Sequence, residues 1–518
     1  MLRTDLIASV PALLRRQAEA RGVQTAYTDA RTAITYGELL TTTGALAGHL
    51  QDFGVAPGDT VAIFLPNSVA WIQACFATLR AGAISVPISY DATEPEVGYR
   101  LSDAACRIVI TTDERAELVK RASSGAPVRL ILVERGTETH DGARFADLVA
   151  TASKPPRDPD AIHDPSFIIY TSGTTGRAKG VLLSQHSMLW VTAACWAPIC
   201  GLSSEDVVLS PLPLFHSYAL NLSVLSILAV GATEHLVERF STQDVLKALS
   251  EGRATFMPGV PTMFHYLLQA SGAAPVRLPK MRLCVSAGAI MPATLNREFE
   301  EHFGVPLLDG YGITETSTMV TMNWPVGGRV LGSCGLPVPG LAVRIVDAAS
   351  GQDVATGGEG ELIVRGPNLM SGYHNKPEET ATALRNGWYH TGDLARSDEN
   401  GFLTITGRLK ELIIRGGQNI APAEIEEVAI QFDGVRDCAV LGAPHAHLGE
   451  VPVIFVAVKE GCEIHADGLI DHCRTYLSAY KVPQDVYVVP EIPRTGSGKI
   501  MRFKLRVHLE QKAASTTT

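Results

Sequence analysis

The chain has 518 residues, of which 46% are hydrophobic and 19% are charged, a balance typical of a globular multidomain protein rather than of a disordered chain. Its formal net charge of −10 argues against a nucleic acid or an anionic membrane as partner, because both favour a dominant basic surface. Nine cysteines without a Cys-x-x-Cys pair argue against a zinc or dithiol site and fit a reducing, cytoplasmic environment.

The beginning of the chain predicts no export signal and no integral membrane segment. Residues 1–20 interrupt their apolar runs with charges, which is typical of an amphipathic helix. The longest apolar stretch, 218–232, contains Asn221 and falls short of the roughly 20 residues that cross a bilayer. We therefore expect a buried core helix there.

Up to about residue 400, short Val-rich and Ile-rich runs alternate with helical patterns. Such alternation is typical of parallel sheets covered by helices, and so of an α/β fold. The first unit predicts a strand at 60–66, a helix at 68–82 and a strand at 83–89. Further strands are predicted at 107–112, 128–134, 167–172, 254–259 and 282–287.

From about residue 330 the pattern changes to short strands with Gly and Pro turns, which predicts a small β-rich subdomain. Its strands are expected at 341–347, 360–366 and 401–407. After Arg408 the predicted elements are a helix that begins near Pro422, strands at 438–443, 451–458 and 486–490, and a helix near 466–480. We therefore predict an N-terminal domain of residues 1–408 and a separate α+β domain of residues 409–518.

The densest chemical signal is the segment Tyr-Thr-Ser-Gly-Thr-Thr-Gly-Arg-Ala-Lys-Gly at 170–180. Its small and hydroxylated residues leave amides and hydroxyls free to surround polyphosphate, and Lys179 adds positive charge. A Walker loop would need Gly where Ala178 stands and Ser or Thr where Gly180 stands, which disfavours a P-loop kinase or ATPase. By itself the segment is equally consistent with a turn between two strands.

Several further motifs follow in a fixed order that resembles the adenylate-forming superfamily, which contains acyl-CoA synthetases, peptide-synthetase adenylation domains and beetle luciferases. They are PLPLFHS (211–217), SAGAIMP (286–292), DGYGITET (309–316), GELIVRG (360–366), WYHTGD (388–393), TGRLKELIIRGGQNIAPAEIE (406–426) and PRTGSGK (493–499). The resemblance covers nearly the whole chain. The chain is similar in particular to the AMP-forming acyl-CoA synthetase branch.

The resemblance implies a nucleotide site. Within it Tyr311 stacks on adenine, Thr314 faces the phosphates, and Glu315 holds Mg²⁺, a cation that prefers hard oxygen ligands. Asp393 accepts hydrogen bonds from the ribose hydroxyls, and Arg408 reaches ribose and phosphate. Taken alone, Glu315 also fits a helix cap, Asp393 a turn residue and Arg408 a solvated cation. The full implied nucleotide set is Thr171, Ser172, Gly173, Thr174, Thr175, Lys179, Gly288, Ala289, Asp309, Gly310, Tyr311, Gly312, Thr314, Asp393, Arg408 and Lys499.

The resemblance also implies the catalytic residues Lys499, Thr314, Glu315 and His216. Lys499 would enter from the C-terminal domain and neutralise both the attacking carboxylate and the α-phosphate. Its neighbours Arg502, Lys504 and Arg506 are expected to be solvated. His216 would lie beside the substrate carboxylate, although a lone histidine is more often structural.

Lys410 falls at the hinge of the family, where the C-terminal domain is expected to swing between an adenylating and a thioester-forming pose. Gly416 and Gly417 resemble the loop that lines the CoA tunnel, although each alone fits a simple β-turn. Two departures stand out. Ile290 replaces a common proline, which bears on the shape of the adenine-side loop, and Glu411 replaces a frequent aspartate, a change expected to be silent.

The substrate is predicted from what the pocket segments lack. Residues 216–224 contain no aspartate to hold an α-amino group, and residues 256–264 and 317–320 are mostly apolar without an arginine. We predict an ATP-dependent, Mg²⁺-requiring synthetase that converts a hydrophobic monocarboxylic acid, fatty or aromatic, into acyl-AMP and then into the CoA thioester. The alternatives are a stand-alone ligase that loads an acyl-carrier protein and a luciferase-like oxygenase.

Overall fold

The computed structural model describes residues 2–128, 130–133, 144–171, 178–415, 418–445, 447–494 and 500–516. The chain consists of two compact units. Unit 1 comprises Met1–Ala342 and Val364–Tyr389, and unit 2 comprises Val343–Ile363 and His390–Thr518. The predicted boundary after Arg408 lies inside unit 2, and the independent motion of residues 409–518 stays a prediction.

A seven-stranded sheet in unit 1 carries the predicted β-α-β pattern. The strands, in spatial order, are β18 (Gly372–Tyr373), β8 (Lys179–Ser184), β7 (Pro165–Thr171), β4 (Ile84–Pro87), β3 (Thr60–Phe64), β5 (Ile108–Thr111) and β6 (Leu130–Val133). From β7 to β6 they run parallel, whereas β8 is antiparallel to both β7 and β18. β3 is buried at every position, which explains its continuous apolar sequence.

A nine-stranded sheet forms the second layer of unit 1. Its strands, in spatial order, are β15 (Leu336–Pro337), β14 (Thr318–Met322), β13 (Leu307–Ile313), β12 (Leu283–Ser286), β11 (Phe256–Gly259), β9 (Val207–Ser210), β10 (Thr233–Leu236), β1 (Thr25–Thr28) and β2 (Ala33–Thr35). β12 and β13 are parallel, and β14 turns back antiparallel to β13. The carboxyl end of β13 is therefore an edge where the chain reverses.

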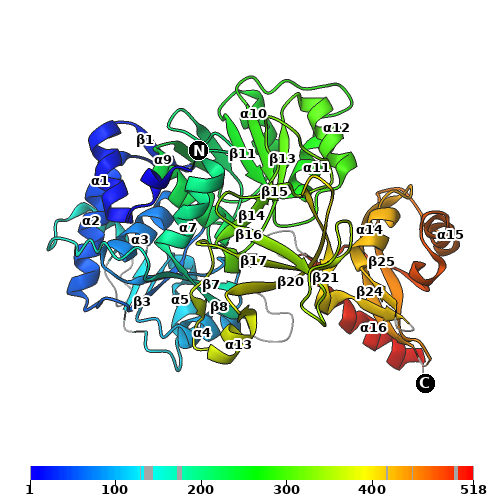
Figure 1. The fold of residues 1–518 in the computed structure, drawn as a ribbon. Helices are drawn as coiled ribbons and strands as arrows, with labels where there is room; N and C mark the ends of the chain where they lie inside the picture. Colours follow the sequence, from blue (N-terminus) through cyan, green and yellow to red (C-terminus); the bar gives the residue numbers. More distant parts are fainter. Residues whose placement is uncertain are drawn as a thin grey trace. The chain divides into compact units, whose positions relative to one another are not determined.

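Helices surround both sheets of unit 1 (Figure 1). They are η1 (Thr4–Leu6), α1 (Val10–Arg21), α2 (Tyr36–Asp52), α3 (Val69–Arg80), α4 (Glu94–Asp103), α5 (Asp113–Ala122), α6 (Phe145–Ala150), α7 (Gln185–Val191), η2 (Thr192–Trp196), α8 (Ser217–Ala219), η3 (Leu220–Ser226), α9 (Ile227–Val230), α10 (Thr242–Ser250), α11 (Pro261–Ala270), α12 (Ala293–Phe303), η4 (Thr314–Thr316) and α13 (Pro377–Ala383). Ser68 begins α3 by accepting a hydrogen bond from the Trp71 amide, and the entire helix is buried between the sheets, as its apolar composition requires.

The apolar stretch 218–232 is a buried helical run, as predicted. It consists of α8, the π-helical η3 and α9, and it ends at Gly231, which has a φ of 81°. Asn221 is satisfied inside it, because its side chain accepts a hydrogen bond from Trp196 Nε1 at 2.6 Å and donates one to the Met188 carbonyl at 2.7 Å. Among the described residues, no helix combines the length and the apolar character that a membrane span requires.

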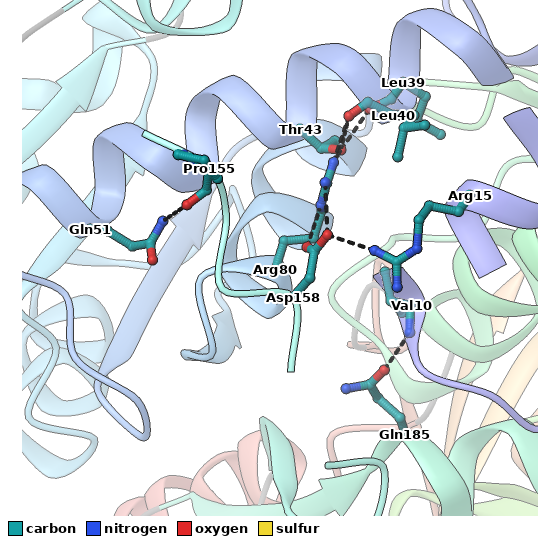
Figure 2. A network of polar contacts seen from close by, with 10 residues as sticks. All are labelled: Val10, Arg15, Leu39, Leu40, Thr43, Gln51, Arg80, Pro155, Asp158 and Gln185. Atoms are coloured by element: carbon teal, nitrogen blue, oxygen red, sulfur yellow. Dashed lines mark hydrogen bonds and ion pairs between the residues drawn. The ribbon is translucent and has the colours of Figure 1, made fainter. Parts of the chain in front are cut away.

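A buried polar network joins the first helices of unit 1 to the segment that leads into β7 (Figure 2). Arg80 of α3 donates to Asp158 through Nε at 2.8 Å and to Thr43 of α2 at 2.9 Å. Arg15 of α1 donates to the second oxygen of Asp158 at 2.8 Å. Asp158 has a φ of 47°, which is uncommon for a residue with a side chain, and its carboxylate joins α1 to α3.

Unit 2 contains the β-rich subdomain and the C-terminal α+β part. The subdomain is built on β16 (Ala342–Val346), β17 (Gly360–Arg365), β20 (Trp388–Ser397) and β21 (Leu403–Arg408), and β19 (Leu384–Arg385) of unit 1 pairs with the start of β20. The C-terminal part contains η5 (Leu409–Glu411), β22 (Ile413–Arg415), β23 (Gln418–Ile420), α14 (Pro422–Ala429), β24 (Val435–His445), β25 (Gly449–Val458), α15 (Ala466–Tyr476), η6 (Ala479–Lys481), β26 (Asp485–Val488) and α16 (Arg502–Thr516). The predicted α/β class, β-rich subdomain and C-terminal α+β fold are confirmed.

Candidate active site

The turn after β13 holds Thr314 and Glu315 at the end of the sheet. Gly312 is required where β13 meets β14, because a Cβ atom there would lie 1.8 Å from the Thr318 carbonyl oxygen. After η4, Ser317 and Thr318 adopt φ values of 53° and 104°. A left-handed backbone at two residues with side chains is strained, and such strain is common at functional sites.

Side chains from two other segments fix this turn. Tyr373 of β18 donates its hydroxyl hydrogen to Glu315 Oε1 at 3.1 Å, and the Met370 amide donates to the Glu315 carbonyl at 2.8 Å. Thr314 Oγ1 lies 3.1 Å from Ser217 Oγ of α8. Burial, and next the negative charge of Glu315, raises the pKa of Tyr373 well above its usual value, so its phenol remains a hydrogen-bond donor at neutral pH.

Lys179 lies near the ring of the same tyrosine. It begins β8, opposite Thr171 at the end of β7, and its Nζ lies 4.9 Å from the centroid of the Tyr373 ring. Gly180 next to it leaves no room for a side chain, because a Cβ atom would lie 2.6 Å from Ile168 Cγ2. A cation and a carboxylate thus flank one aromatic ring at the end of the predicted phosphate loop.

The predicted adenine side lies on neighbouring strands of the nine-stranded sheet. Asp309 of β13 pairs with Ser286 of β12, and Asp309 Oδ1 is buried with no hydrogen-bond partner in the described part of the chain. Burial raises the pKa of Asp309 well above its ordinary value. Gly288 follows with a φ of 87°, which glycine adopts readily, and Ile290 is 48% exposed, so the departure from proline concerns a surface side chain.

The remaining predicted residues of unit 1 lie close to these positions in the chain. Tyr311, Gly310 and Gly312 belong to β13, and Ala289 is exposed beside Gly288. His216 immediately precedes Ser217, the residue that contacts Thr314, and its ring centroid lies 4.2 Å from that of Phe215.

In unit 2, Asp393 and Arg408 face each other across β20 and β21. Arg408 Nε lies 2.8 Å from Asp393 Oδ1, and the Asp393 side chain is only 3% exposed. The predicted hinge residue Lys410 is exposed and lies two residues later in the short turn η5.

One expectation about a charged neighbour of Lys499 is wrong. Arg502 is not solvated but lies half-buried between Glu411 and Glu426, with N–O distances of 3.0 and 2.6 Å. It also donates through Nε to the Val440 carbonyl at 3.2 Å. Glu411 thereby joins η5, beside the predicted hinge, to the start of α16. That its replacement of a frequent aspartate is silent stays a prediction.

Some predicted residues lie outside the described part of the chain. They are Ser172, Gly173, Thr174, Thr175, Gly416, Gly417 and Lys499. Their predicted roles stay predictions.

Sequence reasoning missed Tyr373 and Ser217, which contact Glu315 and Thr314. Both lie beside residues that carried a signal: Ser217 ends the PLPLFHS motif, and Tyr373 follows a glycine a few residues after the GELIVRG motif. Their contacts with the site come from chain separations of 97 and 58 residues, which spacing within one motif does not reveal.

The donor set suits Mg²⁺ bound mainly through a nucleotide. Within the described residues, no three His, Cys, Asp or Glu side chains gather into a metal cage. One carboxylate, Glu315, and one hydroxyl, Thr314, stand beside Lys179 and its aromatic neighbour. Mg²⁺ commonly takes one or two protein oxygens and completes its octahedron with phosphate and water, so these residues fit that ion.

Two family profiles match the chain. The profile described as "AMP-binding enzyme" matches residues 14–374, and "AMP-binding enzyme C-terminal domain" matches residues 424–499. A feruloyl-CoA synthase from Amycolatopsis is 36% identical over 95% of this chain and 97% of its own length. A long-chain-fatty-acid–CoA ligase from Bacillus subtilis is 33% identical over 91% of this chain and 89% of its own length.

Solved structures agree. An anthranilate CoA ligase in complex with anthranoyl-AMP superposes with a TM-score of 0.91 and 27% identity, over 99% of this chain and 100% of that chain. A benzoate CoA ligase from Burkholderia xenovorans superposes with a TM-score of 0.87 and 30% identity, over 96% of this chain and 99% of that chain.

Proposed function

Because the chain belongs to the AMP-binding enzyme family and is an acid–CoA ligase, we propose that it activates a hydrophobic monocarboxylic acid, aromatic or fatty, through an acyl-AMP intermediate. The observation that carries the proposal is the convergence of Lys179, Tyr373 and Glu315 at the end of the predicted phosphate loop. The apolar composition of residues 256–264 and 317–320 supports a substrate without a second charge.

In the first half-reaction, a substrate carboxylate oxygen attacks the α-phosphorus of ATP, and pyrophosphate leaves. Glu315 and Thr314 would hold Mg²⁺, which supplies positive charge to the departing pyrophosphate. Lys179 adds a protein cation beside the same phosphates. Lys499 is proposed to neutralise the repulsion between the carboxylate and the α-phosphate, which otherwise opposes the attack.

Four described residues are proposed to bind the nucleoside. Asp309 offers a buried oxygen without a hydrogen-bond partner in the described residues, which suits an N–H donor such as an adenine amino group. Tyr311 offers a ring for stacking. Asp393 and Arg408 would bind the ribose, since a fixed carboxylate can accept hydrogen bonds from both hydroxyls of a vicinal diol.

In the second half-reaction, the CoA thiolate attacks the acyl carbonyl and AMP leaves. We propose that residues 409–518 rotate about Lys410 between the two steps and that Gly416 and Gly417 then line the CoA path. The nine cysteines are free thiols and only Cys462 is exposed, which supports a cytoplasmic location.

The test is a panel of carboxylic acids in a pyrophosphate-release assay, followed by mass spectrometry of the thioester. We expect higher kcat/KM for aromatic or medium-chain monoacids than for malonate or any amino acid. CoA and a phosphopantetheinylated carrier protein are compared as acceptors, and light emission with a luciferin is measured in parallel. A preference for a dicarboxylate, or transfer only to the carrier protein, would contradict the proposal.

A further inference from the structure

A buried glutamate contacts the segment of β20 that directly precedes Asp393. Glu361 belongs to β17, and its side chain is 7% exposed. Its Oε2 atom lies 2.8 Å from His390 Nδ1, and its Oε1 atom accepts a hydrogen bond from the Gly392 amide at 3.1 Å. Both oxygens are therefore bound to residues that directly precede Asp393 in the chain.

The neighbouring threonine adds a second pair of contacts. Thr391 Oγ1 donates to the Leu362 carbonyl at 2.6 Å and accepts from the Asp393 amide at 3.0 Å. Gly392 adopts a φ of 69°, a left-handed conformation that glycine adopts readily. Two consecutive residues of β17 thus hold the segment His390–Asp393.

Stability alone does not account for the buried Glu361–His390 pair. Removing a carboxylate from water is costly, and a buried polar pair built on one contributes little net stability compared with apolar side chains of similar volume. The pair does orient the backbone, because two hydrogen bonds to one carboxylate fix the segment His390–Gly392 in both position and orientation. Asp393 follows this segment directly, so its orientation depends on it. The Asp393 carboxylate also contacts Arg408, at 2.8 Å.

We propose that Glu361 and His390 are positioning residues that fix the Asp393 carboxylate for recognition of the ribose hydroxyls. Neither residue is placed in contact with the nucleotide, and both act through Asp393. The inference rests on the proposed function, in which Asp393 binds the ribose. Hydrogen bonds to a diol are sensitive to shifts of about 0.5 Å. A substitution that frees the segment His390–Asp393 from Glu361 should therefore weaken recognition of the sugar before it affects other steps.

The experiment compares ATP with 2′-deoxy-ATP and 3′-deoxy-ATP in pyrophosphate release by the full chain. Glu361→Gln keeps the side-chain volume but replaces one acceptor oxygen with a donor group. Discrimination is measured as the ratio of kcat/KM for ATP to kcat/KM for each deoxynucleotide. We expect this ratio to be about tenfold lower in Glu361→Gln than in the wild type. The loss should arise mainly from a higher KM for ATP, with the deoxynucleotides little affected.

Substitutions of His390 and a matched control sharpen the test. His390→Asn keeps a nitrogen donor near the Nδ1 position and should preserve most of the discrimination, whereas His390→Leu should lose it. Asp353→Asn is the control, because Asp353 forms an exposed ion pair with Arg344 at 2.7 Å in the same unit. It should leave the ratio unchanged. Thermal unfolding of each variant separates loss of fold from loss of recognition.

Each outcome is decisive. Asp393→Asn alone should abolish most of the discrimination; if it does not, the proposed ribose role of Asp393 fails and the inference fails with it. If Asp393→Asn abolishes discrimination but Glu361→Gln and His390→Leu retain it, only the inference is overturned. An equal loss of kcat/KM with all three nucleotides would assign Glu361 a structural role and would also overturn it. Should Glu361→Gln fail to fold, the His390 variants decide.

Discussion

Replacing Glu315 with glutamine tests the centre of the proposed adenylation site. Glutamine retains an oxygen that can accept the Tyr373 hydroxyl, which lies 3.1 Å from Glu315 Oε1, but it removes the negative charge. Alanine would be a less clean substitution, because it would leave the half-buried phenol without its acceptor, at a cost of about 1–3 kcal/mol. Glu315→Gln therefore separates the charge from the structural role of the side chain.

The expected magnitude follows from the position of the carboxylate at the edge of the sheet. At an effective dielectric constant of about 20, two unit charges about 4 Å apart interact by about 4 kcal/mol. Removing single electrostatic groups from active sites costs about 2.7–4 kcal/mol. Since about 1.4 kcal/mol corresponds to a factor of ten in rate, Glu315→Gln should slow adenylation about 100-fold to 1,000-fold. Tyr373→Phe keeps the charge and should slow it about tenfold or less.

The assay is pyrophosphate release at a series of Mg²⁺ concentrations, with thermal unfolding as the check on folding. Glu315→Gln should raise the Mg²⁺ concentration required for half-maximal rate and lower the maximal rate. Tyr373→Phe should mainly raise the Mg²⁺ requirement, because it removes only the bond that orients the carboxylate. A folded Glu315→Gln variant with wild-type pyrophosphate release at limiting Mg²⁺ would refute the assignment of Glu315.

Three further predictions concern stability and the division of the reaction. Asp158→Ala should lower the free energy of unfolding by about 3–5 kcal/mol in urea denaturation, because Arg80, with a side chain only 6% exposed, would lose its carboxylate; a loss below about 1 kcal/mol would contradict this. Burial raises the pKa of Glu234 well above its usual value, so its contribution to stability is fully present below about pH 4.5 and is lost as the pH rises. Glu234→Gln should therefore make the unfolding free energy depend less on pH between about pH 5 and 8, and unchanged slopes would argue against it. Lys499→Ala should block acyl-AMP formation yet still convert supplied acyl-AMP and CoA into thioester. Lys410→Pro restricts the backbone at the hinge, so this variant should accumulate acyl-AMP. Equal loss of both steps in both variants would contradict the two-pose mechanism.

The strands of the two large sheets could be predicted because burial on both faces demands continuous apolar runs. β3 is buried at every position. Its sequence Thr-Val-Ala-Ile-Phe is most favourably placed in the core, as a strand or a helix. The π-helical geometry of η3 could not be predicted in the same way. It depends on where Asn221 finds its partners Trp196 and Met188, and these lie 25 and 33 residues away in the chain.

The charged residues of the C-terminal region show that local sequence also fails to predict which charges are paired. Arg502, Lys504 and Arg506 form a basic cluster in sequence, and such clusters are usually solvated. Arg502 is an exception because α14 and the turn η5 bring Glu426 and Glu411 to it, from 76 and 91 positions earlier in the chain. Local composition gives the charge of a residue, whereas the fold decides whether that charge meets water or a carboxylate.

The two motif glutamates illustrate why geometry is needed to assign roles. Glu315 and Glu361 both belong to short motifs near strands, and sequence alone gives each the same chemistry. Within the described residues, one oxygen of Glu315 accepts a hydrogen bond from Tyr373, which orients the carboxylate while leaving its charge at the end of the sheet. Both oxygens of Glu361 already take part in a hydrogen bond, one with His390 and one with the Gly392 amide, and the side chain is only 7% exposed, so this carboxylate has little access to a ligand. The contacts and the burial of each carboxylate therefore separate the acid that would bind the cation from the acid that would orient its neighbour.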